Sequence, residues 1–197
     1  FDANGDGRAD MVACPPGWGC EQVISHHMDT YDLHDHVNLI TAAYAASFAD
    51  ALARYRNGEP VLYYTWTPNF TVVQLVPGED VVWINVPEIV PSEAQQGLED
   101  AMVASGVTGA VTDPLRFGFV ANDIRPVASR AFLDANPAAA ALFEAVQIPL
   151  GDISEMTRRI SEGESSDQAI SDMASEWIEN NRDRVDGWLE GARAASM

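Results

Sequence analysis

The segment from Cys14 to Cys20, with the sequence CPPGWGC, constrains the fold of this chain more than any other. The only two cysteines enclose a Pro-Pro pair, two glycines and one tryptophan, Trp18. Apolar side chains recur at helical spacing directly afterwards, which predicts a helix over about residues 20–32. The sequence therefore places a tryptophan, held in a stiff loop, at the N-terminus of a helix.

Such a loop presents two kinds of binding group. The first backbone N–H groups of a helix have no partner within it, and the positive end of the helix dipole attracts an anion there. The face of Trp18 attracts a cation, best of all an alkylated ammonium group. The loop is therefore a candidate receptor for a small zwitterion.

The spacing of Cys14 and Cys20 fits one local disulfide. Closing a ring of this size would stabilise the fold by about 2–3 kcal/mol in the chain-entropy model. A disulfide would indicate an oxidising compartment, whereas two buried free thiols are the alternative. The spacing is not that of a CxxC redox centre, and no second cysteine pair is present for a zinc site.

The charge of the chain narrows its possible partners. Its 197 residues include 30 acidic and 11 basic residues, giving a net charge of −19, and every basic residue is arginine. Such a charge repels nucleic acid and anionic membrane surfaces. The simplest interpretation is that the negative charge keeps the protein soluble. The alternative is that it steers a cationic ligand toward the protein. No apolar run reaches the roughly 18–20 residues of a membrane span.

The first residues resemble the start of a calcium-binding loop. Asp2, Asn4 and Asp6 alternate, a glycine follows, and Asp10 comes next. The pattern fails where a bidentate Glu should stand, because Ala13 occupies that position. A structural calcium ion held by Asp2, Asn4, Asp6 and Asp10 is one hypothesis, and a turn whose side chains cap their own backbone is the other.

Helical and strand patterns alternate and then give way to helices alone, which predicts an α/β fold. Strands are predicted at 37–40, 61–65, 81–86 and 117–121, and helices at 43–57 and 92–105. Gly58 is placed to end the helix at 43–57, and Pro137 to open a later one. Five further helices are predicted at about 128–134, 137–146, 152–162, 166–180 and 182–195.

The other tryptophans separate by position. Trp66 follows the apolar strand at 61–65, and ligands of α/β sheets bind at the carboxyl ends of strands. Trp66 is thus a second aromatic residue where a ligand is expected. Trp83 lies within a predicted strand, and Trp177 and Trp188 lie on apolar helix stripes, so these three are predicted to be core residues.

Nothing in the sequence favours an enzyme. It contains no nucleophile elbow, HExxH motif, P-loop or dinucleotide fingerprint. The four histidines, His26, His27, His34 and His36, invite a metal interpretation. However, the first two diverge on a helix, and solvated histidines are the simpler interpretation.

Several motifs, in order along the chain, resemble the glycine betaine/proline betaine-binding proteins of osmoprotectant ABC importers. They lie at residues 4–10 (NGDGRAD), 16–21 (PGWGCE), 63–68 (YYTWTP), 80–83 (DVVW), 136–140 (NPAAA) and 186–188 (DGW). The resemblance covers essentially the whole chain and is weakest at about 87–125.

The resemblance implies a type II periplasmic-binding-protein fold, with two α/β lobes around a cleft, and a ligand held in a box of tryptophans. By position, Trp18 and Trp66 match two walls of the box, and the N–H groups of Gly19 and Cys20 match the carboxylate site. Cys14 and Cys20 match the family's disulfide. The implied partners are a zwitterionic compatible solute and a membrane permease with its ATPase. The implied location is periplasmic or extracytoplasmic, free or lipid-anchored, and no cofactor is required.

The N-terminal region of the family has no counterpart in this sequence. That region would carry a third box tryptophan, a histidine that helps to hold the carboxylate, and much of one lobe. The expected division is a nearly complete ligand-binding lobe at 1–112, and a returning strand with C-terminal helices of the other lobe at 113–197. We expect such a chain to bind its ligand poorly or to need the missing region.

A calcium-stabilised extracellular adhesion module is the alternative function. It would keep the acidic loop at 2–10 and use Trp18 and Trp66 as core residues. A binding role for exposed aromatic residues is the more common one.

Overall fold

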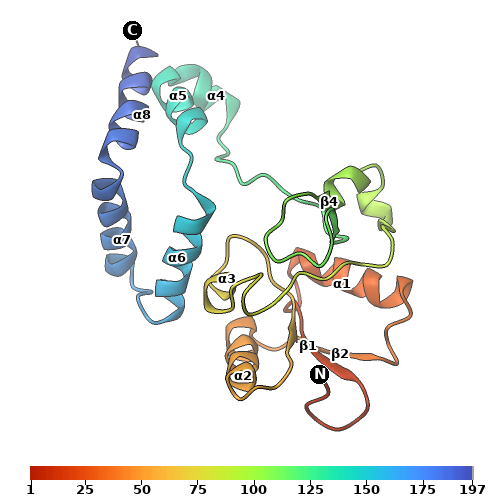
Figure 1. The fold of residues 1–197 in the computed structure, drawn as a ribbon. Helices are drawn as coiled ribbons and strands as arrows, with labels where there is room; N and C mark the ends of the chain where they lie inside the picture. Colours follow the sequence, from red (N-terminus) through yellow and green to blue (C-terminus); the bar gives the residue numbers. More distant parts are fainter. Residues whose placement is uncertain (197) are drawn as a thin grey trace. The chain divides into compact units, whose positions relative to one another are not determined.

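The computed structural model describes residues 1–196. The chain forms two compact units, Phe1–Ala121 and the residues from Asn122 onward (Figure 1). The first unit contains the strands and the first helices, and the second contains helices alone. The α/β class predicted from the sequence is therefore the fold of the first unit.

A three-stranded parallel sheet organises the first unit. Its order is β2 (Val37–Ile40), β1 (Ala9–Val12), β3 (Leu62–Tyr63), and Ala9 pairs with Val37 at the start of the ladder. Helix α1 (Gly19–Thr30) connects β1 to β2, and α2 (Tyr44–Arg56) connects β2 to β3. Parallel neighbours need such crossover helices. The predictions for α1, β2 and α2 are confirmed, whereas the central strand β1 was not predicted.

The two helices cover opposite faces of the sheet. Successive side chains of β1 alternate, so that Met11 packs in a cluster with Ile24 and Met28 of α1, while Val12 packs with Ala51 of α2. Phe48 of α2 and Leu75, both fully buried, form a further cluster with the partly buried Tyr63. Burial of each such large side chain stabilises a fold by about 1.5–3 kcal/mol. The sheet therefore has a packed core on both faces.

The predicted buried strand at 81–86 is wrong. Trp83 makes only an isolated bridge to Ala110, through bonds of 2.8 Å to the Gly109 carbonyl and 3.0 Å from the Val111 N–H. Val82 and Ile84 are 59% and 61% exposed, and Trp83 itself is half-buried rather than in the core. Without a partner strand along its length, the apolar run stays extended but unpaired.

Two further elements differ from their predictions because glycines interrupt them. The predicted helix at 92–105 consists of two short 3₁₀ turns, η1 (Glu93–Gln95) and η2 (Glu99–Met102), followed by strand β4 (Val103–Ala104). Gly97 lies between the turns with a φ of +84°. The predicted strand at 117–121 is displaced to β5 (Leu115–Arg116), which pairs with β4 and ends before Gly118 at a φ of +71°. The short helix α3 (Thr71–Gln74) was not predicted.

The second unit contains the five predicted helices. They are α4 (Arg130–Ala135), α5 (Pro137–Ala145), α6 (Leu150–Ser161), α7 (Asp167–Asn180) and α8 (Arg182–Ala194). Serine side chains cap α4 and α7, and Pro137 opens α5 as predicted. No helix in the described part of the chain is long and apolar enough to cross a membrane.

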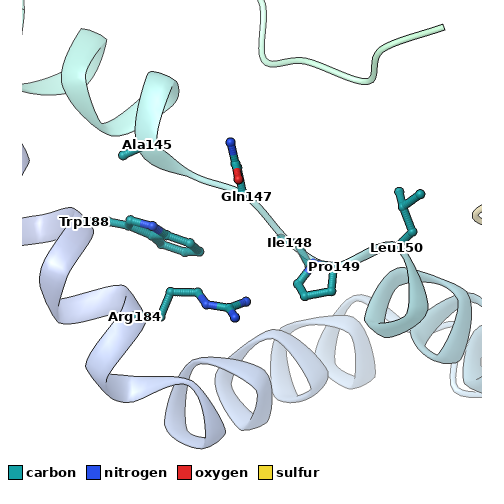
Figure 2. Close-up of a pocket in the computed structure, with 7 residues that line it drawn as sticks. All are labelled: Ala145, Gln147, Ile148, Pro149, Leu150, Arg184 and Trp188. Atoms are coloured by element: carbon teal, nitrogen blue, oxygen red, sulfur yellow. The ribbon is translucent and has the colours of Figure 1, made fainter.

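The tryptophans of α7 and α8 stack on each other. The rings of Trp177 and Trp188 lie 6.1 Å apart at 17°, and the Trp177 indole N–H donates to Asp152 of α6 at 2.8 Å. Both rings are half-buried, so the prediction that they are core residues is wrong. Figure 2 shows Trp188 and Arg184 of α8 beside the segment from Ala145 to Leu150. These side chains line a pocket of about 430 Å³.

Candidate functional site

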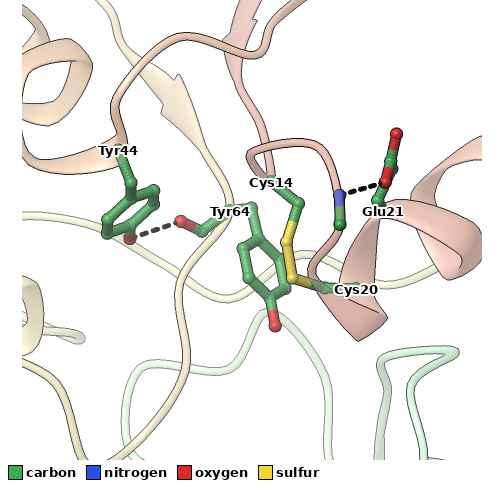
Figure 3. The surroundings of a disulfide bond; sticks show 6 residues. Cys14, Cys20, Glu21, Tyr44 and Tyr64 are labelled. Carbon is green, nitrogen blue, oxygen red and sulfur yellow. Dashed lines mark hydrogen bonds between the residues drawn. A yellow bond between two sulfur atoms is a disulfide. The ribbon is translucent and has the colours of Figure 1, made fainter.

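The loop between β1 and α1 is closed by a disulfide. Cys14 and Cys20 are bonded, with their Cα atoms 5.9 Å apart (Figure 3), which confirms the predicted pairing. Gly17 adopts a φ of +88°, and its N–H donates to the Glu21 carboxylate at 2.7 Å. The ring and this hydrogen bond together hold the loop against the first turn of the helix.

Helix α1 begins directly after Trp18. Trp18 is its N-cap in extended conformation and contributes no side-chain hydrogen bond. The Glu21 N–H donates to the Trp18 carbonyl at 3.0 Å, but within residues 1–196 no acceptor is found for the N–H groups of Gly19 and Cys20. Gly19 is exposed and Cys20 is half-buried. Two backbone donors at the positive end of the helix are thus available to an anion.

The structure brings Trp66 to this loop. Trp66 follows β3 at its carboxyl end, and its ring centroid lies 5.7 Å from that of Trp18 with the planes at 74°. Trp18 is 44% exposed and Trp66 is half-buried. Edge-to-face aromatic pairs contribute about 0.5–1.5 kcal/mol beyond their burial. The two tryptophans singled out from the sequence are therefore neighbours, each with part of its surface in solvent.

Tyr44 joins this aromatic cluster, a role that the sequence interpretation missed. Its ring lies 6.0 Å from Trp18 and 5.4 Å from Trp66, and its hydroxyl donates to the Tyr64 carbonyl at 2.7 Å. The Tyr64 ring lies 5.7 Å from Trp66. Burial raises the pKa of Tyr44 to about 12, so it is neutral at physiological pH. One feature of the sequence could have indicated this role: Tyr44 follows the predicted strand at 37–40 by only a few residues. Its position on the apolar face of the predicted helix at 43–57 indicated only a core residue.

The acidic loop at the start of the chain uses its oxygens on its own backbone. The Asp2 carboxylate accepts from the N–H groups of Gly5, Asp6 and Gly7 at 2.7–3.2 Å. The Asp6 carboxylate accepts from the Arg8 N–H and the Asn38 amide, and these hydrogen bonds lower its pKa to about 2.

The remaining two members of the predicted calcium set are also engaged. The side-chain amide oxygen of Asn4 accepts from the Asp6 N–H at 2.8 Å, and the carboxylate of buried Asp10 accepts from the Ala3 N–H at 2.8 Å. Among the described residues no group of three or more His, Cys, Asp or Glu side chains is arranged to hold a metal ion. The structure does not bring Asp2, Asn4, Asp6 and Asp10 together around a cation position, and the calcium hypothesis stays a prediction.

Two of the four histidines are not solvated, contrary to the simpler interpretation of the sequence. His26 is half-buried against the Val90 carbonyl at 2.8 Å, and His27 against the Gly118 carbonyl at 3.2 Å. Burial lowers the pKa of His27, against the opposing effect of the Gly118 carbonyl. His34 and His36 are exposed, as expected. These two half-buried rings therefore attach α1 to the segments around residues 90 and 118.

The sequence matches, over residues 2–180, a family described as the substrate binding domain of the ABC-type glycine betaine transport system. This chain belongs to that family. Family membership confirms the resemblance inferred from the ordered motifs, and it agrees with the periplasmic-binding-protein-like α/β fold predicted for the chain.

Three relatives support the assignment. The chain is 42% identical over 196 residues to a glycine betaine-binding periplasmic protein, OusX, of Dickeya dadantii. It is 40% and 38% identical to the glycine betaine/proline betaine-binding periplasmic proteins of Salmonella typhimurium and Escherichia coli. The alignments cover 99–100% of this chain but 56% of each relative. The chain thus spans little more than half the length of these proteins.

Proposed function

We propose that this chain captures a quaternary-ammonium zwitterion of the glycine betaine/proline betaine class for an ABC importer. The observation that carries the proposal is the pairing of Trp18 with Trp66 beside the N–H groups of Gly19 and Cys20. The names of the relatives support the choice of solute. The lack of the catalytic motifs named above also fits a binding role better than an enzymatic one.

The two halves of the ligand need different partners. A quaternary ammonium group has no N–H to donate, so carboxylates recognise it poorly, whereas each aromatic face accepts it at about 0.5–2 kcal/mol. Its carboxylate gains charge-assisted hydrogen bonds from backbone N–H groups at a helix start. Trp18 and Trp66 would hold the cation, and Gly19 and Cys20 the anion.

The compartment and the partners follow from the same proposal. The disulfide between Cys14 and Cys20 suits an oxidising compartment, and the names of the relatives describe periplasmic proteins. The proposed location is therefore periplasmic or otherwise extracytoplasmic, free or lipid-anchored. The bound solute would pass to a membrane permease and its ATPase. The proposal includes no cofactor, and the acidic loop is the only place for a structural calcium ion that the sequence suggested.

A screen of compatible solutes tests the proposal. Tryptophan fluorescence and thermal shift of the chain should respond to glycine betaine and proline betaine. Choline carries the quaternary ammonium without the carboxylate, and should bind more weakly by about tenfold or more, because the helix start then has no anion to hold. If choline binds as tightly as glycine betaine, the carboxylate site is wrong. If no solute of this class has any effect, even at concentrations high enough to detect the weak binding expected of this chain, the proposed ligand is wrong.

A further inference from the structure

The carboxyl ends of all three parallel strands contribute an aromatic residue to one place. β1 leads into the disulfide loop with Trp18, β3 leads to Trp66, and β2 leads through three residues to Tyr44, the first residue of α2. Ligands of open α/β sheets bind at this edge. Tyr44 is therefore the member of the aromatic cluster that comes from the third strand.

The ring of Tyr44 contacts both tryptophans without being open to solvent. Tyr44 is 6% exposed, and its ring also packs edge-on against Phe70 at 6.3 Å. The three centroid distances among Tyr44, Trp18 and Trp66 are 5.4, 5.7 and 6.0 Å, so the rings form a nearly even triangle. A buried ring in this position supports the tryptophan rings rather than offering a surface to a ligand.

The hydroxyl of Tyr44 fixes the backbone that carries Trp66. It donates to the carbonyl of Tyr64, which lies two residues before Trp66 (Figure 3). A hydroxyl buried this deeply needs a partner, because leaving a buried polar group without a hydrogen bond is strongly unfavourable. The start of α2 is thus attached to the end of β3 at the point where the chain turns to present Trp66.

We propose that Tyr44 is a positioning residue of the binding site, whose ring sets the spacing and tilt of Trp18 and Trp66 and whose hydroxyl holds the backbone of Trp66. The expected consequence, tighter binding of the ligand by preorganised aromatic walls, rests on the proposed function. The positioning itself is a property of the ligand-free chain and can be measured without any ligand.

The direct test is the circular dichroism couplet that two closely spaced indoles produce. The measurement uses a Trp177→Phe background, because the stacked pair of Trp177 and Trp188 gives a couplet of its own. Trp66→Phe in that background identifies the signal of the Trp18–Trp66 pair. Tyr44→Leu should abolish this signal, and Tyr44→Phe, which keeps the ring, should retain much of it.

Tyr63→Leu is the matched control. Tyr63 is a partly buried tyrosine of the neighbouring strand, and in the described part of the chain its ring contact is with Phe48, 5.1 Å away, and with neither tryptophan. The couplet of the Tyr63→Leu variant should match that of the Trp177→Phe background chain. The inference is overturned if Tyr44→Leu keeps the couplet while folded, or if Tyr63→Leu loses it equally. Far-ultraviolet dichroism and urea midpoints establish that each variant is folded.

Should Tyr44→Leu fail to fold, Tyr44→Phe decides the matter through binding. Removing only the hydroxyl should weaken glycine betaine binding by about 3- to 10-fold, which corresponds to about 0.6–1.4 kcal/mol. Tyr63→Phe should leave it unchanged. Equal affinity of Tyr44→Phe and the unsubstituted chain would overturn the positioning role. If the unsubstituted chain binds no betaine but its couplet depends on Tyr44, the proposed ligand is wrong and the positioning role holds.

Discussion

The two units of the chain bury their apolar side chains to very different extents. In the first unit Phe48, Leu75 and Met102 are at most 1% exposed. Among the described residues from 122 onward, the buried apolar side chains are Met173 and Ala192 alone. The core that supports the aromatic cluster therefore lies entirely within residues 1–121, and the proposed binding residues depend on that unit for their geometry.

The exposed side chains of the second unit complete the contrast. Ile124 and Val127 are 78% and 96% exposed, and Phe143 of α5 is 37% exposed although it stacks on Phe132. Most helical stability in proteins comes from packing an apolar face, and the helices of this unit leave apolar side chains such as Phe143 partly exposed. We therefore expect these helices to gain less stability from packing within their unit than α1 and α2 gain within theirs.

The largest expected effect compares two phenylalanines. Phe48→Ala removes a fully buried ring and should lower the free energy of unfolding by about 3–5 kcal/mol, because a cavity remains in the core of the first unit. Phe143→Ala in the second unit should cost about 1 kcal/mol, because its ring is partly in solvent already. Urea titrations followed by circular dichroism measure both. If both substitutions lowered the free energy of unfolding equally, the difference in burial between the two units would not correspond to a difference in stability.

The next effect compares two tryptophans of the first unit. Trp66→Ala should weaken binding of glycine betaine about tenfold, about 1.4 kcal/mol, because one aromatic face for the cation is lost. Trp83→Ala should leave affinity nearly unchanged, because Trp83 bridges Ala110 and has no ring contact with Trp18 or Trp66 in the described chain. Calorimetric titration decides between them, and an unchanged affinity for Trp66→Ala would remove this residue from the site.

A smaller effect concerns the pH dependence of the first unit. Burial holds the pKa of His27 below its unfolded value of about 6.5. As the pH falls, the unfolded chain therefore takes up a proton at this residue before the folded chain does. Stability from this group is complete above that value and is lost as the pH falls through the folded pKa. His27→Gln should flatten the dependence of the urea midpoint on pH below about 6.5, whereas His36→Gln, at an exposed site, should not. A similar change in both variants would argue against the buried ring as the cause.

The smallest effect is expected at the acidic loop. Its oxygens already accept hydrogen bonds from the backbone, as Asp2 does from Gly7 at 2.8 Å, so a chelator should leave the melting temperature unchanged. A rise in melting temperature with added calcium, lost in Asp6→Asn, would establish the calcium hypothesis instead.

Local signals in the sequence predicted the regular elements well. The stripe of α2 ends where Gly58 takes a φ of +80°, and Pro137 opens α5. The predictions failed where the outcome depends on distant partners. Residues 81–86 have the composition of a strand, but no neighbour pairs with them along their length. Gly97 and Gly118 interrupt the other two predicted elements with left-handed conformations that composition does not reveal.

The candidate site was predictable only in part, for the same reason. Trp18 and Trp66 could each be recognised from local context, one at a helix start and the other at a strand end. Their proximity depends on β1 and β3 being neighbours, and β1 was not recognised as a strand. The part played by Tyr44 depends in addition on β2 lying on the other side of β1, which periodicity along one helix does not show.

The disulfide of the loop has a consequence for when the chain could capture its ligand. Cys14 and Cys20 join the end of β1 to the first turn of α1, so their bond holds the helix start that would receive the carboxylate. The reducing conditions of a cytosol keep such thiols unbonded. We therefore expect a newly made chain to be a poor binder until it reaches an oxidising compartment. Export would then act as the maturation step, and a cell that accumulates the solute in its cytosol would not have it sequestered by its own receptor.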